Sequence, residues 1–196
     1  MKKVSKYMND IDYKSMQFKL LSNELPPLDF YNDYPIVLDD WQINTLRCID
    51  KGISVLVCAP TSCGKTWLSI YPGLSGKKVL FIVPSVALVY QVGSLFKKFG
   101  ANICLITEDF TYDDPNYSVI IGTPKYVENK LPIIGNRFDI VVYDEIHNLS
   151  SNQFGNYYER LIKILKNNQF LALSATIGNP DKLVNWFNKI CNRKIK

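Results

Sequence analysis

Short apolar runs and longer amphipathic stretches alternate along this chain from residue 39 onward. Most of the apolar runs lack the strict alternation of a half-exposed strand, which is typical of strands covered on both faces. The predicted strands are residues 53–59, 78–85, 117–123, 138–144 and 170–176, with a weaker sixth at 102–106. Strands and helices that alternate at this length predict an α/β fold with right-handed crossovers and a mainly parallel β-sheet.

Helical periodicity and capping residues mark the segments between these strands. Asp39 or Asp40 caps the first predicted helix, and Gly52 ends it. The other predicted helices cover residues 86–100, 156–167 and 179–190. Residues 1–37 have weak periodicity and several prolines, so we interpret them as an irregular or partly helical N-terminal extension of a domain formed by residues 38–196.

The first predicted strand runs into the segment APTSCGKT, residues 59–66. This segment matches the template of a phosphate-binding loop, with Ala59 in place of the first glycine. In such a loop, backbone N–H groups and a helix N-terminus surround phosphate oxygens, the lysine contacts the β- and γ-phosphates, and the threonine ligates Mg²⁺. A chance match in a surface turn is the alternative, which the strand before the segment and the helix after it disfavour. The predicted nucleotide-binding residues are Ala59, Pro60, Thr61, Ser62, Cys63, Gly64, Lys65 and Thr66.

Two carboxylates, Asp144 and Glu145, stand at the end of the predicted strand 138–144. A carboxylate in this position can hold the Mg²⁺ that bridges the phosphates, and its neighbour can activate the attacking water. An acidic strand end that caps the next helix is the alternative. Because ligands of such sheets bind beyond the carboxyl ends of the strands, both motifs are expected at one edge. Together they predict a nucleoside triphosphate site.

Composition limits the possible partners and compartments. The net charge of +5 permits a polyanionic partner without requiring one. The five cysteines form no CxxC pair, and a single histidine cannot complete a common Cys/His zinc site, so no zinc is expected. No run approaches the ~20 apolar residues that span a bilayer, so no membrane contact is expected. We expect a soluble intracellular protein of the cytoplasm or nucleus. The many Lys, Asn, Ile and Tyr residues also suit a viral protein in the host cytoplasm.

The order of the motifs resembles that of superfamily 2 helicases with a DExH box, over residues 36–190. The resemblance rests on the segments APTSCGKT, PSVALVYQ, GTPKYVENKL, DEIH and SAT, at residues 59–66, 84–91, 122–131, 144–147 and 174–176. The string LSATIGNP is similar to the corresponding segment in one branch of DExH helicases. That branch includes exosome-assisting and interferon-induced RNA helicases and also some DNA helicases. The resemblance implies a three-layer, RecA-like P-loop NTPase domain that hydrolyses ATP with Mg²⁺.

The resemblance also implies roles for individual residues in the nucleotide site. Lys65, Asp144 and Glu145 would be catalytic, with Glu145 as the general base. Thr66 and Asp144 would hold the metal, and Gln42 would read the adenine of ATP.

Two further groups are implied to couple hydrolysis to movement and to contact nucleic acid. His147, Ser174 and Thr176 would couple hydrolysis to strand movement, and a histidine that only packs against the strand ends is the alternative. The implied contacts with single-stranded RNA or DNA, with RNA favoured, are Pro84, Ser85, Thr123 and Pro124.

Members of the family use a second RecA-like domain, which supplies an arginine finger. We expect that domain to be absent from this chain, because its four arginines fit no such motif, and to arrive on another chain. A lone first domain would bind nucleotide better than it hydrolyses it. The alternatives are a DNA helicase, a split-gene fragment and a non-catalytic nucleotide- or RNA-binding module.

Overall fold

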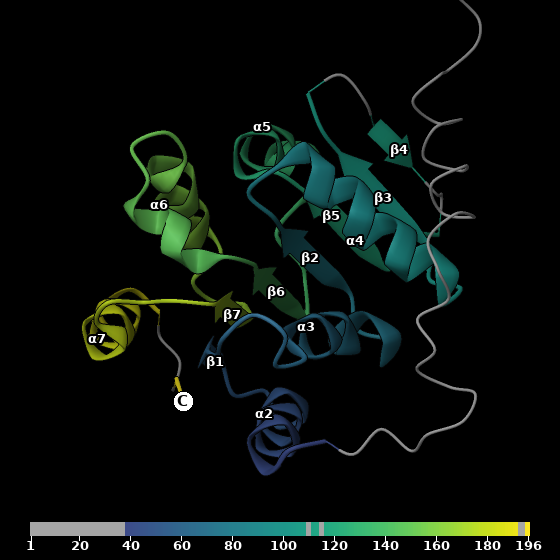
Figure 1. Ribbon diagram of the computed structural model, residues 1–196. Helices are drawn as coiled ribbons and strands as arrows, with labels where there is room; N and C mark the ends of the chain where they lie inside the picture. The colour runs from purple at the N-terminus through teal and green to yellow at the C-terminus, as the bar shows by residue number, and fades with distance from the viewer. Residues whose placement is uncertain (1–37, 109–110, 114–115, 192–194) are drawn as a thin grey trace, which may run out of the picture.

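The computed structural model describes residues 38–108, 111–113, 116–191 and 195–196, so the predicted N-terminal extension lies outside the described residues. Seven strands form one sheet in the order β1-β7-β6-β2-β5-β3-β4 (Figure 1). The strands are β1 (Val55–Cys58), β2 (Val79–Ile82), β3 (Ile103–Ile106), β4 (Thr111–Asp113), β5 (Val119–Gly122), β6 (Ile140–Tyr143) and β7 (Gln169–Ser174). All neighbouring pairs are parallel except β3 and β4. The mainly parallel sheet predicted from the sequence is confirmed.

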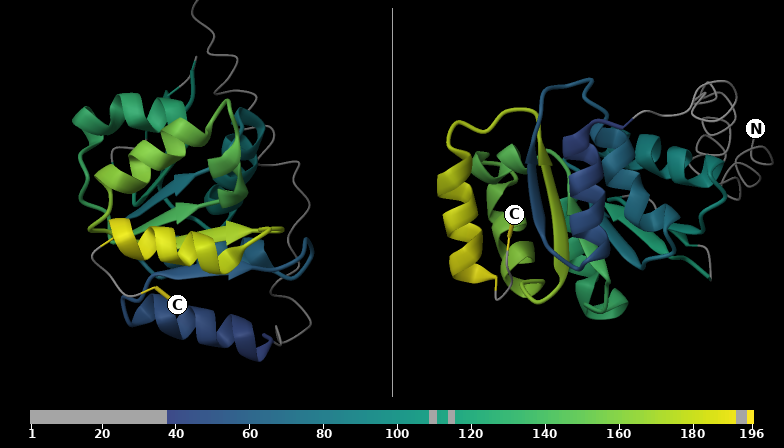
Figure 2. Two further views of the ribbon diagram at one scale, coloured as in Figure 1. Left: turned by 90° about the vertical axis from the view of Figure 1, so that its left-hand side faces the viewer. Right: turned by 90° about the horizontal axis from the view of Figure 1, so that it is seen from below.

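Helices cover both faces of this sheet, as the right-hand view of Figure 2 shows. The helices are α2 (Asp40–Asp50), α3 (Lys65–Leu74), α4 (Val86–Lys98), α5 (Pro124–Ile134), the 3₁₀ helix η1 (Ile146–Ser150), α6 (Gly155–Ile164) and α7 (Pro180–Ile190). One apolar cluster joins the sheet to α2, α3 and α4, and a second joins it to α5, η1, α6 and α7. The three-layer architecture is therefore also confirmed.

None of the helices in the described part of the chain has both the length and the apolar character needed to cross a bilayer.

Burial on both faces explains the continuous apolar runs of the sequence. Every residue of β2, β3, β5, β6 and β7 is buried, so there is no solvent face that would select polar residues at alternate positions. Strand β4 was not predicted. It is three residues long and pairs antiparallel with β3 at the edge of the sheet, and so short a segment carries no readable periodicity.

The strand order brings the two chemical motifs together. β7 lies between β1, which leads into the phosphate loop, and β6, which leads into the acidic pair. Because all three strands are parallel, the segments that follow them leave the same edge of the sheet. The end of β7 therefore separates the two motifs and can contact both.

Candidate nucleotide site

The phosphate loop winds through two residues with left-handed backbone conformation. Ser62 and Gly64 both have φ of +74°, and Gly64 is the N-cap of α3. Glycine adopts this conformation freely, whereas a serine there stores local strain that the surroundings must offset. The Lys65 ammonium donates hydrogen bonds across the loop, to the carbonyl oxygens of Ala59 at 2.6 Å and Pro60 at 2.9 Å. The loop is thus closed on its own backbone, with Lys65 at its centre.

Gln42 connects this loop to the start of α2. Its side-chain Nε2 donates to the Cys63 carbonyl at 3.0 Å, and its Oε1 accepts from the Asp39 N–H at 2.9 Å. The φ of Gly64 favours glycine, and a Cβ there would lie 2.6 Å from Gln42 Nε2, so that any other residue would displace the Gln42 amide. The residue predicted to read adenine is therefore also a support of the phosphate loop, and its side chain is largely buried.

The acidic pair sits in a tight, hydrogen-bonded turn. Glu145 has φ of +48° and ψ of +51°, a left-handed conformation that a non-glycine residue seldom adopts. Its N–H donates to Asp144 Oδ1 at 3.0 Å, and its carbonyl accepts from the side chain of Asn148 at 2.9 Å. Tyr158 of α6 donates its hydroxyl to the Asp144 carbonyl at 3.1 Å. These contacts fix the backbone of both residues and the carboxylate of Asp144 relative to the end of β6.

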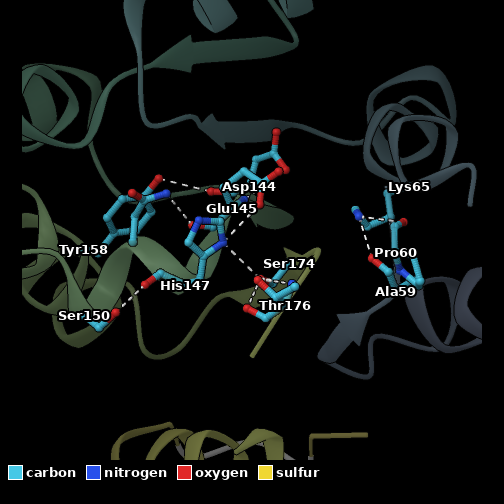
Figure 3. A network of polar contacts seen from close by, with 11 residues as sticks. Ala59, Pro60, Lys65, Asp144, Glu145, His147, Ser150, Tyr158, Ser174 and Thr176 are labelled. Atoms are coloured by element: carbon cyan, nitrogen blue, oxygen red, sulfur yellow. Dashed lines mark hydrogen bonds and ion pairs between the residues drawn. The ribbon is translucent and has the colours of Figure 1, made fainter. Parts of the chain in front are cut away.

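The electrostatics of Asp144 depend on both loops. Burial, followed by the neighbouring Glu145 carboxylate, raises the pKa of Asp144 to about 6. The hydrogen bond from the Glu145 N–H and the positive charge of Lys65 oppose this rise in the pKa, as does His147. The charge of Lys65 therefore acts on the Asp144 carboxyl, and Figure 3 shows the two loops facing each other. The structure brings together the predicted lysine and the predicted acidic pair.

His147 lies between the acidic pair and the end of β7 (Figure 3). Its Nδ1 is 3.1 Å from Glu145 Oε2 and 3.1 Å from Ser174 Oγ. The Ser174 hydroxyl donates to the Thr176 carbonyl and accepts from the Thr176 N–H, so its single hydrogen is already used. A proton on Nδ1 would suit both oxygens that face it, Ser174 Oγ and Glu145 Oε2. The His147 side chain is 44% exposed, and its ring contacts Glu145 and Ser174 through polar atoms.

Ser174 also contacts the phosphate loop directly. Its carbonyl accepts a hydrogen bond from the Ala59 N–H at 3.1 Å, while its hydroxyl meets His147. One residue at the end of β7 thus touches both motifs. Thr176, the third predicted coupling residue, is exposed and holds Ser174 Oγ in place.

The four residues predicted to contact nucleic acid follow β2 and β5. Ser85 is exposed and caps α4, accepting from the Leu88 N–H at 3.4 Å, and Pro84 is half-buried. Thr123 and Pro124 are buried at the start of α5. The Thr123 hydroxyl has no hydrogen-bond partner among the described residues. All four follow strands parallel to β6, and hence lie on the edge that carries the acidic pair.

The oxygen atoms at this edge suit Mg²⁺. Within the described ranges, no three His, Cys, Asp or Glu side chains lie close enough together to hold a metal ion by themselves. Mg²⁺ that accompanies a nucleotide needs only one or two protein oxygens, because phosphate oxygens and water complete its shell. The Asp144 carboxylate and the Thr66 hydroxyl are ligands of that kind. Glu145 Oε2 is buried, has no ordinary hydrogen bond to any described residue, and adds negative charge nearby.

One supporting residue, Tyr158, and one supporting contact, that of Gln42 with the phosphate loop, were not predicted from the sequence. Tyr158 was identified only as one member of an apolar stripe on its helix, with Leu161, Ile162 and Leu165. The contact between Gln42 and the phosphate loop joins residues that are 21 positions apart. A polar atom on an otherwise apolar helix face was the available signal for Tyr158.

The chain is similar in sequence to known helicases. The family model of the DEAD/DEAH box helicases matches residues 39–183. The chain is 32% identical over 166 residues to the DExH-box ATP-dependent RNA helicase DExH9 of Arabidopsis thaliana, covering 81% of the chain and 17% of that protein. It is 36% identical over 162 residues to the ATP-dependent DNA helicase Hel308 of Methanocaldococcus jannaschii, covering 71% of the chain and 14% of that protein. The chain thus spans less than a fifth of the length of either relative.

The fold is also found among solved structures. A hypothetical ATP-dependent RNA helicase from Sulfolobus tokodaii superposes with a TM-score of 0.67 at 21% identity. The superposition covers 95% of this chain and 57% of that one. At this level of identity the likeness supports the fold alone.

Proposed function

Because this chain belongs to the DEAD/DEAH box helicase family, we propose that residues 38–196 are the ATP-binding motor domain of a nucleic-acid helicase. The domain would hydrolyse ATP with Mg²⁺ and use the energy to remodel strands, preferably of RNA. The observation that carries this proposal is the arrangement of the phosphate loop and the DEIH segment on the two sides of the β7 end, with the charge of Lys65 acting on Asp144.

The proposed chemistry begins with the phosphate loop. Lys65 would release the Ala59 and Pro60 carbonyls and donate to phosphate oxygens instead. A charged donor binds charged phosphate oxygens more strongly than neutral carbonyl oxygens. Thr66 and Asp144 would hold Mg²⁺, which supplies charge neutralisation on the phosphates when bound. Gln42 would keep the loop in shape and contact the adenine.

The DEIH segment would supply the base. Glu145 would orient the attacking water and take its proton, with its Oε2 restrained by His147 Nδ1. His147 also contacts the Ser174 hydroxyl, and the Ser174 carbonyl accepts from the Ala59 N–H. A movement of one loop would therefore be transmitted to the other through these two hydrogen bonds. We infer that His147, Ser174 and Thr176 couple the nucleotide site to strand movement.

Nucleic acid would bind along the same edge, at the segments that follow β2 and β5. The N-terminus of α5 and the exposed Ser85 suit a backbone phosphate, and so does the Thr123 hydroxyl, which has no partner among the described residues. Such contacts read the backbone rather than the bases, so binding should weaken steeply with salt. The chain is similar to both RNA and DNA helicases, so the proposed RNA preference is tested by comparing the two nucleic acids.

The proposal is tested by ATP turnover with no nucleic acid, with single-stranded RNA, and with single-stranded DNA of equal length. We expect RNA to stimulate turnover most, and Lys65→Ala to abolish the stimulation. The assay is repeated with candidate second RecA-like domains supplied on another chain. Tight ATP binding without turnover under every condition would instead identify a non-catalytic nucleotide-binding module.

A further inference from the structure

We propose that Tyr158, on α6, is a positioning residue that fixes the peptide between Asp144 and Glu145, so that both carboxylates face the nucleotide site. This inference rests on the proposed function and adds a residue that matches none of the motifs. It makes α6, which lies behind the acidic segment, part of the machinery that prepares the site for Mg²⁺.

The Asp144–Glu145 peptide needs external support because Glu145 is left-handed. A non-glycine residue with φ of +48° is strained, and such residues persist only where neighbouring groups hold them. A rotation of this peptide would move Glu145 out of the left-handed conformation and break the hydrogen bond between its N–H and Asp144 Oδ1. The N–H of the peptide is held by Asp144 Oδ1, and its carbonyl is held by Tyr158.

Tyr158 is built for this single hydrogen bond. Its side chain is fully buried, and its hydroxyl lies 3.1 Å from the Asp144 carbonyl oxygen. Burial, with the nearby carboxylates of Asp144 and Glu145, raises the pKa of Tyr158, so the hydroxyl stays protonated. A protonated phenol beside a carbonyl oxygen donates a hydrogen bond to it.

A second contact fixes α6 against the segment that carries His147. A Cβ on Gly155, the first residue of α6, would lie 2.3 Å from the Leu149 carbonyl oxygen in η1. The Gly155 N–H also donates to the Ser151 carbonyl at 2.9 Å. Helix α6 can therefore approach η1 only with glycine at this position, and that approach places Tyr158 within reach of Asp144.

The test measures how strongly Mg²⁺ tightens the binding of a fluorescent ATP analogue. The Kd is measured in Mg²⁺ and in EDTA for the full chain, Tyr158→Phe and Tyr157→Phe. We expect the ratio of the Kd in EDTA to the Kd in Mg²⁺ to be about five-fold smaller for Tyr158→Phe, which is the effect of one hydrogen bond. The Kd in EDTA should stay within about two-fold of that of the unaltered chain. Tyr157→Phe, the half-buried neighbour on the same helix, should retain the full Mg²⁺ effect.

A change in overall stability alone would not alter the ratio of the two Kd values. If Tyr158→Phe keeps the full Mg²⁺ effect, the positioning role is wrong while the proposed function stands. If the unaltered chain binds the analogue without any Mg²⁺ effect, the proposed function fails as well.

Gly155→Ala provides an independent approach should Tyr158→Phe not fold, as judged by circular dichroism. It should also lose Mg²⁺-dependent tightening. Its control, Gly178→Ala, places the new Cβ in open space and should leave the ratio of Kd values unchanged. Equal ratios for the two glycine variants would overturn the inference.

Discussion

The phosphate loop and the DEIH segment leave the same edge of the sheet but are built in different ways. In the loop, Pro60, Thr61, Ser62, Gly64 and Thr66 are exposed, and the lysine binds the backbone of its own loop. In the acidic segment, Ile146 is fully buried, and contacts from Tyr158, Asn148 and Ser174 hold the backbone and the histidine. The loop can adjust to a phosphate, whereas the geometry of the acidic pair is set in advance.

This difference assigns separate effects to the two regions. Changes in the loop should act mainly on nucleotide affinity, because the loop must rearrange to bind. Changes in the acidic segment should act on hydrolysis, on the Mg²⁺-dependent part of binding and on pH-dependent stability, because charged groups are held there in a partly buried turn.

The largest effect is expected from Glu145→Gln. Loss of the proposed general base should lower ATP turnover by about 10²–10⁴-fold, the usual contribution of such a group. The amide has nearly the same shape, so ATP affinity should stay within about two-fold. Steady-state turnover and equilibrium binding of the same preparation check both parts. Unchanged turnover would assign the base to another residue.

A smaller effect is expected from Gly64→Ala in the phosphate loop. Alanine in a left-handed conformation costs about 1–2 kcal/mol, and here its Cβ must also displace the Gln42 amide from Cys63. Gly52→Ala is the matched control, with φ of +71° and open space around the new Cβ. Urea unfolding should show Gly64→Ala about 1 kcal/mol less stable than Gly52→Ala, the net worth of one hydrogen bond. Only Gly64→Ala should weaken ATP binding.

Asp144→Asn should stabilise the protein at alkaline pH. Burial, with the neighbouring Glu145 carboxylate, raises the pKa of Asp144 from 3.8 to about 6. The ionised carboxylate therefore lowers the free energy of unfolding, and this destabilisation is fully present above about pH 6. That cost shrinks as the pH falls from 6 towards 3.8 and is absent below. At about 1.4 kcal/mol per pKa unit, the variant should be about 1–3 kcal/mol more stable at pH 8 and nearly equal near pH 4.

Urea unfolding at both pH values measures this difference. Asp181→Asn, at an exposed position in the first turn of α7, is the control for removing a charge elsewhere. An Asp144→Asn variant that is less stable than the original chain at pH 8 would contradict a costly buried charge at that position.

The sequence reveals the central strands and the two motifs because their signals are local. Buried parallel strands read as unbroken apolar runs, and residues 59–66 and 144–147 are contiguous segments behind such runs. Asn179 was predicted to cap α7, and its side chain accepts from the Lys182 N–H at 2.9 Å. These features need no knowledge of how distant segments pack.

The supports of the site are not local, and the sequence does not reveal them. The hydroxyl of Tyr158 meets Asp144 only because η1 turns the chain back and Gly155 lets α6 approach it. Gln42 meets Cys63 only because α2 lies beside the phosphate loop. In both cases the residue type was visible, but its partner depends on tertiary packing.

The most direct test of the account is a double-mutant cycle of Lys65→Ala and Asp144→Asn, with the free energy of Mg²⁺-ATP binding measured by calorimetry. Each single variant should bind more weakly, by about 1.5–3 kcal/mol for the lysine, as for a hydrogen bond to a charged group. If both residues act on one Mg²⁺-triphosphate, the two losses should be non-additive by at least about 0.5 kcal/mol. Strictly additive losses, or ATP bound as tightly by Lys65→Ala as by the unaltered chain, would contradict convergence of the two loops on one nucleotide.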